Sequence, residues 1–162
     1  MQRNRLGVKP AGAYALKTTG AEVGLVEDNL VTKALRLFEQ RTGSPCHYQI
    51  MLEKCIPPAA GLGGGSSDAA AVLQALNKLQ AAGLGKEDLE EMAVLLGSDV
   101  PFFLREGPCW CRGRGEILEE TVVDELDLLL LKPAFGVDTA DAYGRWEDSD
   151  EIPYVRYESQ EV

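Results

Sequence analysis

Apolar residues recur at helical spacing early in the chain. The first helix is predicted within residues 27–43, where Asp28 or Asn29 serves as the N-cap and Gly43 ends the helix. Its apolar stripe consists of Leu30, Ala34, Leu37 and Phe38.

Two further helices are predicted in the middle of the chain. The longer one lies within residues 66–83, with Ser66 or Ser67 as its cap and Gly83 as its end. A shorter helix follows within residues 85–97. The apolar positions of these two helices are Val72, Leu73, Leu76 and Leu79 in the first, and Leu89, Met92, Ala93 and Leu96 in the second.

Alternating and continuous apolar runs predict strands between these helices. Residues 47–54 alternate apolar Tyr48, Ile50 and Leu52 with more polar neighbours, as a half-buried strand does. Residues 13–18 give a weaker strand signal, and residues 108–120 are strand-like. The run "LDLLLLKP" at 126–133 predicts a buried strand, and a short helix is predicted around residues 138–146. This mixture indicates an α+β fold.

Composition and charge narrow the class of partner. The 162 residues carry 26 acidic and 16 basic side chains, for a net charge of −10. Nucleic acid and anionic membranes are therefore not expected as partners, because both select basic surfaces. No apolar run approaches the ~20 residues that cross a bilayer, and no signal peptide is predicted, so a cytoplasmic location is expected.

The cysteines and the single histidine do not predict a metal site. No C-x-x-C pair occurs among Cys46, Cys55, Cys109 and Cys111, and His47 stands alone. We expect free, mostly buried thiols and no bound structural metal. His47 has no nearby nucleophile, so no catalytic role is expected for it.

The segment "PPAAGLGGGSSDAA", which begins at Pro57, joins a strand to a helix. Glycines at 61, 63, 64 and 65 permit positive φ and close approach of the backbone to a ligand. The helix start that follows favours anions. No Lys-Ser/Thr pair follows the glycines, so the segment is not a Walker A loop, and it does not fit the dinucleotide G-x-G-x-x-G pattern. The residues alone leave two interpretations open: an anion-binding loop or a tight structural turn.

The same segment resembles the P-x-x-x-G-L-G-S-S-A-A signature of the GHMP kinases, named for galactokinase, homoserine, mevalonate and phosphomevalonate kinases. Its longer G-G-G-S-S-D-A-A form is similar to the branch that phosphorylates a cytidyl-diphosphate derivative of methylerythritol in non-mevalonate isoprenoid biosynthesis. "EDNLV" at 27–31, "LGSDVPFFL" at 96–104 and "GRGEIL" at 113–118 agree with that branch, and "KPAFGVDTADAY" agrees more loosely. The resemblance covers about Glu27 to Trp146.

The resemblance implies a kinase fold like domain 2 of ribosomal protein S5, an ATP donor with Mg²⁺, and a small-molecule acceptor. It implies Asp99 as catalytic base, although a capping or turn aspartate before Pro101 is the alternative from the residues alone. It also implies that Thr139 contacts substrate. The implied nucleotide-binding residues are Pro57, Pro58, Ala59, Ala60, Gly61, Leu62, Gly63, Gly64, Gly65, Ser66 and Ser67.

Two neighbours of the glycine segment have alternative roles. Lys54 either reaches phosphate or is a solvated lysine at a strand end. Asp68 is expected to be a first-turn residue favoured by the helix dipole rather than a metal ligand.

The chain also departs from the family pattern. No K-x-N strand like the one that opens the family is found, since Lys9 and Lys17 stand in other contexts. We therefore expect residues 1–146 to form a partial N-terminal kinase domain, residues 147–162 to begin a further subdomain, and the isolated chain to be inactive. The alternatives are a homoserine- or mevalonate-type kinase, a nucleotide-binding remnant without turnover, and a purely structural domain.

Overall fold

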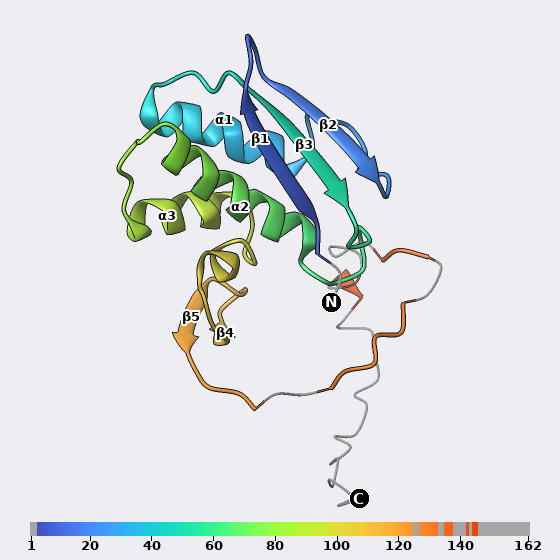
Figure 1. Ribbon diagram of the computed structural model, residues 1–162. Helices are drawn as coiled ribbons and strands as arrows, with labels where there is room; N and C mark the ends of the chain where they lie inside the picture. Colours follow the sequence, from blue (N-terminus) through green and yellow to red (C-terminus); the bar gives the residue numbers. More distant parts are fainter. Residues whose placement is uncertain (1–2, 125–126, 133–134, 138–141, 143, 146–162) are drawn as a thin grey trace, which may run out of the picture.

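A three-stranded sheet covered on one face by helices forms the main body of the protein (Figure 1). The computed structural model describes residues 3–124, 127–132, 135–137, 142, 144 and 145. The strands are β1 (Arg5–Pro10), β2 (Ala15–Gly20) and β3 (Tyr48–Lys54), in the order β1-β3-β2. β1 runs antiparallel and β2 parallel to β3, so the connection from β2 to β3 is a crossover that contains the first helix.

The helices are α1 (Leu30–Thr42), α2 (Gly64–Leu79) and α3 (Lys86–Leu96). The predicted caps of α1 are confirmed: the Asn29 side chain accepts a hydrogen bond from the Val31 N–H at 2.9 Å, and Gly43 ends the helix with φ of 68°. Within the described part of the chain, no helix combines the length and apolar character needed to span a membrane.

The hydrophobic core lies between the sheet and the three helices. On β3, Ile50 and Leu52 are fully buried while the intervening Met51 is 53% exposed, as the alternating pattern predicts. The helices contribute the rest of the core, mainly Val31, Ala34, Leu35 and Phe38 from α1, Ala69, Ala70, Val72, Leu73 and Leu76 from α2, and Met92 and Ala93 from α3. This packing fixes the ends of β3 and α2, which carry the glycine segment between them.

The predicted N-cap of the second helix is wrong by three or four residues. α2 begins at Gly64 with Gly63 as its N-cap, so Ser66 and Ser67 lie inside the first turn and cap nothing. Gly63 has φ of 64°, in the left-handed region, and its missing side chain leaves the cap without a side-chain hydrogen bond. Because glycine is a poor helix former, the sequence pattern favoured the serines, but contacts with β3 and α1 extend the helix backwards.

Residues 109–120 form a hairpin rather than one strand. β4 (Cys109–Arg112) pairs antiparallel with β5 (Ile117–Glu120), and Gly113 and Gly115 take positive φ in the connecting turn. A short 3₁₀ helix, η1 (Pro101–Leu104), precedes the hairpin. The hairpin turn lies close to Ser98 and Asp99, since a Cβ added at Gly115 would be 3.3 Å from Asp99 Oδ1 and 3.5 Å from the Ser98 carbonyl oxygen.

The prediction of a buried strand at residues 126–133 is wrong for the part that the structure describes. Leu128, Leu129, Leu130 and Leu131 are 68–85% exposed, and residues 127–132 belong to no strand. An apolar run is buried only where a neighbouring element supplies a covering face, and neither described sheet pairs with this segment. The predicted helix near residues 138–146 lies largely outside the described residues.

The four thiols are free, but only Cys46 is buried. The expectation of mostly buried thiols is therefore wrong for Cys55, Cys109 and Cys111, which are partly or fully exposed. Burial, reinforced by the charge of Glu39, raises the pKa of the Cys46 thiol to about 11.

We expect iodoacetamide at pH 8 to alkylate Cys111 at least ~100-fold faster than Cys46 in the folded chain, because alkylation requires a thiolate and an accessible sulfur. Mass spectrometry of timed samples measures the two rates. In the urea-unfolded chain both residues should react at similar rates. Equal rates in the folded chain would contradict the burial of Cys46.

Candidate nucleotide-binding site

The glycine segment forms a loop from Cys55 to Gly63 that connects β3 to α2. Positive φ occurs at Ala59, Gly61 and Gly63, whereas Gly64 and Gly65 are helical, so the predicted backbone freedom is used at two of the four glycines. At Gly63, an added Cβ would lie 2.6 Å from the Cζ atom of Phe103. Close packing and backbone conformation thus both require glycine at position 63.

The loop ends at a helix start whose amide groups have no helical partner. Ser67 is the first residue whose N–H donates within the turn, to the Gly63 carbonyl at 2.9 Å. The N–H groups of Gly64, Gly65 and Ser66 precede it and have no acceptor of the i−4 kind. Together with the helix dipole, these amides favour an anion at the loop. The Ser67 hydroxyl itself donates back to the Gly64 carbonyl at 3.0 Å.

Lys54 and Asp68 form a buried ion pair beneath the loop. The Lys54 Nζ atom lies 2.8 Å from Asp68 Oδ2, and the two side chains are only 4% and 6% exposed. The interpretation of Lys54 as a solvated strand-end lysine is therefore wrong. Asp68 lies beyond the first turn of α2, so its expected place in that turn is also wrong. The buried negative charge of Asp68 is balanced by the Lys54 ammonium, because a buried carboxylate requires a nearby opposite charge.

Sequence reasoning missed Asn4, which lies one residue before β1. Its Oδ1 atom accepts hydrogen bonds from the N–H groups of Cys55 at 3.0 Å and Ile56 at 2.8 Å. Its Nδ2 atom donates to the Asp68 carboxylate at 2.9 and 3.1 Å and to the Gly64 carbonyl at 3.2 Å. No signal within the sequence could have found these contacts, since their partners lie 51 to 64 residues away.

Two hollows flank the loop. The first, of about 430 Å³, lies between the start of α1, the end of β3 and the start of α2. Its lining residues are Glu22, Val23, Gly24, Asp28, Asn29, Leu30, Leu52, Lys54, Pro58, Ala59, Gly65 and Asp68. The second, of about 380 Å³, lies on the other side of the loop and is lined by Gly61, Leu62, Gly63, Asp99, Phe102, Phe103, Cys109, Cys111 and Gly115. The glycine segment is thus the wall shared by both hollows.

Asp99 lies in the second hollow, in the turn before η1. The residue is exposed, and Val100 rather than Asp99 is the N-cap of η1. Within the described residues, its carboxylate makes no hydrogen bond or ion pair, so it serves neither as a cap nor as a salt-bridge partner. Gly115 of the hairpin turn approaches it so closely that an added Cβ would lie 3.3 Å from Asp99 Oδ1. Thr139 lies outside the described residues.

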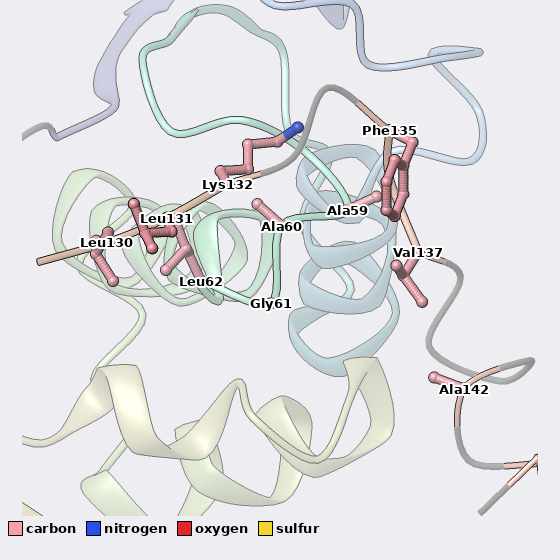
Figure 2. A pocket seen from close by; sticks show the side chains of 10 residues that line it. All are labelled: Ala59, Ala60, Gly61, Leu62, Leu130, Leu131, Lys132, Phe135, Val137 and Ala142. Atoms are coloured by element: carbon pink, nitrogen blue, oxygen red, sulfur yellow. The ribbon is translucent and has the colours of Figure 1, made fainter.

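Residues 130–132 and 135–137, which follow the hairpin in the chain, lie against the glycine loop (Figure 2). The Val137 N–H lies 3.4 Å from the Ala59 carbonyl, and an added Cβ at Gly136 would be 3.1 Å from the Cβ of Ala59. Figure 2 shows Leu130 and Leu131 beside Leu62, and Phe135 beside Ala59, around an apolar hollow. Residues 130–132, part of the segment predicted as a buried strand, therefore lie beside the glycine loop.

The sheet carries helices on one face, the glycine loop runs into a helix start, and an exposed aspartate lies in a hollow beside that loop. The model of the GHMP kinases N terminal domain matches residues 29–107. The chain belongs to the GHMP kinase family. The predicted fold class, an α+β GHMP kinase N-terminal domain, is confirmed by this match and by the structural likeness below.

The chain is 46% identical over 143 residues to 4-diphosphocytidyl-2-C-methyl-D-erythritol kinase of Pelotomaculum thermopropionicum, covering 86% of this chain and 50% of the relative. It is 40% identical over 153 residues to the chloroplastic kinase of that name from Mentha piperita, covering 91% of this chain and 37% of the relative. A crystal structure of 4-(cytidine 5'-diphospho)-2C-methyl-D-erythritol kinase superposes with a TM-score of 0.67 at 37% identity, over 93% of this chain and 55% of that chain.

The chain thus spans about half or less of the length of the curated relatives it matches. Both the glycine segment and Asp99 lie within the matched region of the family model.

Proposed function

We propose that the chain provides the nucleotide-binding part of an ATP-dependent kinase. The proposed reaction is phosphorylation of the 2-hydroxyl of 4-diphosphocytidyl-2-C-methyl-D-erythritol, in non-mevalonate isoprenoid biosynthesis. The observation that carries the proposal is the arrangement of the glycine loop, with its unpaired helix-start amides, between two hollows, one of which contains the unpartnered carboxylate of Asp99. Relatives of that name at 40–46% identity support the choice of substrate.

The two hollows suggest how the reactants divide between them. The hollow bordered by Asn29, Leu30 and Pro58 is proposed to receive the base and sugar of ATP, with the triphosphate following the loop from Ala59 to Ser67. The acceptor alcohol would then enter the hollow that contains Asp99, on the far side of Gly61 and Gly63. Positioning and charge stabilisation supply most of the catalysis of phosphoryl transfer, so a rigid loop between the two reactants is the central requirement.

Asp99 is proposed as the general base. Its carboxylate is free to accept the proton of the attacking hydroxyl, because no other described side chain occupies it. The amides of Gly64, Gly65 and Ser66 are proposed to stabilise the negative charge of the transferred phosphoryl group.

Mg²⁺ is proposed to accompany the nucleotide. Among the described residues, no group of three or more histidine, cysteine, aspartate or glutamate side chains gathers to form a cage. This fits Mg²⁺, which proteins usually hold through one or two carboxylates and the substrate phosphates. When bound, the ion would neutralise phosphate charge; the carboxylates of Glu22, Asp28 and Asp68 line the first hollow, and that of Asp99 lines the second.

We expect Mg·ATP to protect the amides of Gly61 to Ala70 from hydrogen exchange more than those of any other segment. The bound phosphates would accept hydrogen bonds from the loop and from the first turn of α2, and thereby slow local opening. Exchange measured by mass spectrometry with Mg²⁺ alone is the control. Uniform or absent protection by Mg·ATP would contradict the assignment of this loop to nucleotide.

A further inference from the structure

We propose that Asn4 is a positioning residue that holds the nucleotide loop in its binding conformation. The inference rests on the proposed function only for the identity of the ligand, because the contacts of Asn4 are properties of the free chain. The loop runs from the end of β3 to the start of α2, and the side chain of Asn4 binds backbone or side-chain atoms at both ends.

Both the oxygen and the nitrogen of the Asn4 carboxamide make hydrogen bonds. Its oxygen accepts from two consecutive backbone N–H groups, at Cys55 and Ile56, where the chain leaves the sheet. Its nitrogen donates to the first residue of α2, at the Gly64 carbonyl, and to the carboxylate of Asp68 one turn later. A carboxamide carries an acceptor oxygen and a donor NH₂ group, so neither aspartate nor leucine reproduces both sets of bonds.

The ion pair of Lys54 and Asp68 is a second connection between the same two ends. Lys54 is the last residue of β3, and its ammonium meets the carboxylate that Asn4 also contacts. The Asp68 carboxylate is therefore held by one charged and one neutral donor. These contacts keep its oxygens directed toward Lys54 and Asn4, which limits the repulsion that an anionic ligand at the nearby helix start would otherwise meet.

The hydrogen bonds of Asn4 and the ion pair between Lys54 and Asp68 restrain both ends of the loop before any ligand binds. A loop held at both ends loses little conformational freedom on binding, and preorganisation of this kind increases affinity without any direct contact to the ligand. Asn4 itself lines neither of the hollows beside the loop, so its effect on a nucleotide would be indirect.

The first test needs no nucleotide. We expect Asn4→Ala to speed amide exchange at Cys55 and Ile56, where the loop begins, about tenfold or more, because their N–H groups lose the Asn4 Oδ1 acceptor. Asn77→Ala is the matched control: Asn77 also makes two backbone hydrogen bonds, both with Leu84 (2.9 and 3.0 Å), near the opposite end of α2. That variant should speed exchange near residues 77–85 and leave the loop unchanged. Unchanged loop exchange in folded Asn4→Ala would overturn the proposal.

The second test measures Mg·ATP affinity by titration calorimetry. We expect Asn4→Ala to weaken binding about tenfold and Asn77→Ala to leave it within twofold, at matched folded fractions. Asn4→Ser, whose hydroxyl can still donate to Asp68 or accept from a backbone N–H group, should lose less affinity than Asn4→Ala. Asn4→Ser also provides a folded variant if Asn4→Ala does not fold.

The outcomes separate the two proposals. If the unaltered chain binds no Mg·ATP while Asn4→Ala still speeds loop exchange, the nucleotide assignment fails and the role of Asn4 in holding the loop stands. If the chain binds Mg·ATP and the affinity of folded Asn4→Ala equals that of Asn77→Ala, the positioning role fails. If Asn4→Ala does not fold, an affinity of folded Asn4→Ser equal to that of Asn77→Ala would also overturn it.

Discussion

Asp99→Asn lowers kcat by about 100-fold or more in a chain completed to the length of its relatives, if Asp99 is the general base of the proposed reaction. The amide keeps the shape of the side chain but cannot accept the proton of the acceptor hydroxyl. Affinity for ATP should change little, because the glycine loop is a separate segment that Asp99 does not contact through any hydrogen bond. Steady-state kinetics with saturating ATP and acceptor measures the effect.

Glu106→Gln is the matched control for this substitution. It makes the same change from carboxylate to amide on an exposed residue a few positions later, outside the hollow that contains Asp99. Its kcat should remain within twofold of the unaltered value. A near-normal kcat for Asp99→Asn would leave Asp99 as a turn residue and remove the base from the proposed mechanism.

Gly64→Val abolishes measurable binding of Mg·ATP, although the reason differs from the one that the sequence suggested. Gly64 is helical rather than left-handed, so backbone strain does not arise there. Instead, an added Cβ would lie 2.9 Å from Cγ2 of Ile56 and 3.1 Å from its Cβ, and the methyl groups of valine would extend the overlap. The loop must then move away from the helix start whose amides are proposed to bind phosphate. Titration calorimetry measures the loss.

Gly107→Val controls for the general cost of the same substitution. No atom lies within 4 Å of a Cβ added at Gly107, and its φ is not positive. This variant should bind Mg·ATP like the unaltered chain, and circular dichroism should show that both variants are folded. Normal binding by Gly64→Val would show that the start of α2 does not contact the phosphates.

Elements with local signals were predictable from the sequence. α1 combines an apolar stripe with a side-chain cap at Asn29 and a left-handed glycine at 43, and all of these signals lie within the helix or next to it. β3 and α3 were predicted for the same reason, from periods of two and 3.6 residues. The glycine segment and the turn of Asp99 are short motifs whose resemblance to a kinase family could be read directly, and the family match confirms that resemblance.

Short-range sequence patterns gave wrong or missing predictions of secondary structure where burial or strand pairing depends on residues far away in the chain. The apolar run at residues 128–131 was expected inside a sheet, yet no described strand pairs with it. β1 was missed because Gly7, Lys9 and Pro10 obscure its alternation, and it forms by pairing with β3 some 40 residues later. The start of α2 shifted to Gly64 because tertiary packing outweighed the low helix propensity of glycine.

The sequence by itself determined which described segments are helical, where the glycine loop lies, and which carboxylate precedes Pro101. Only the tertiary structure decided what surrounds the loop. Lys54 and Asp68 became a buried pair because β3 and α2 direct both side chains into the same interior, where neither charge could remain alone. Asn4 reached the loop because the pairing of β1 with β3 places it beside Cys55 and Ile56. Hydrogen bonds across 51 to 64 residues leave no periodicity or motif in the sequence, since their geometry exists only after the sheet has formed.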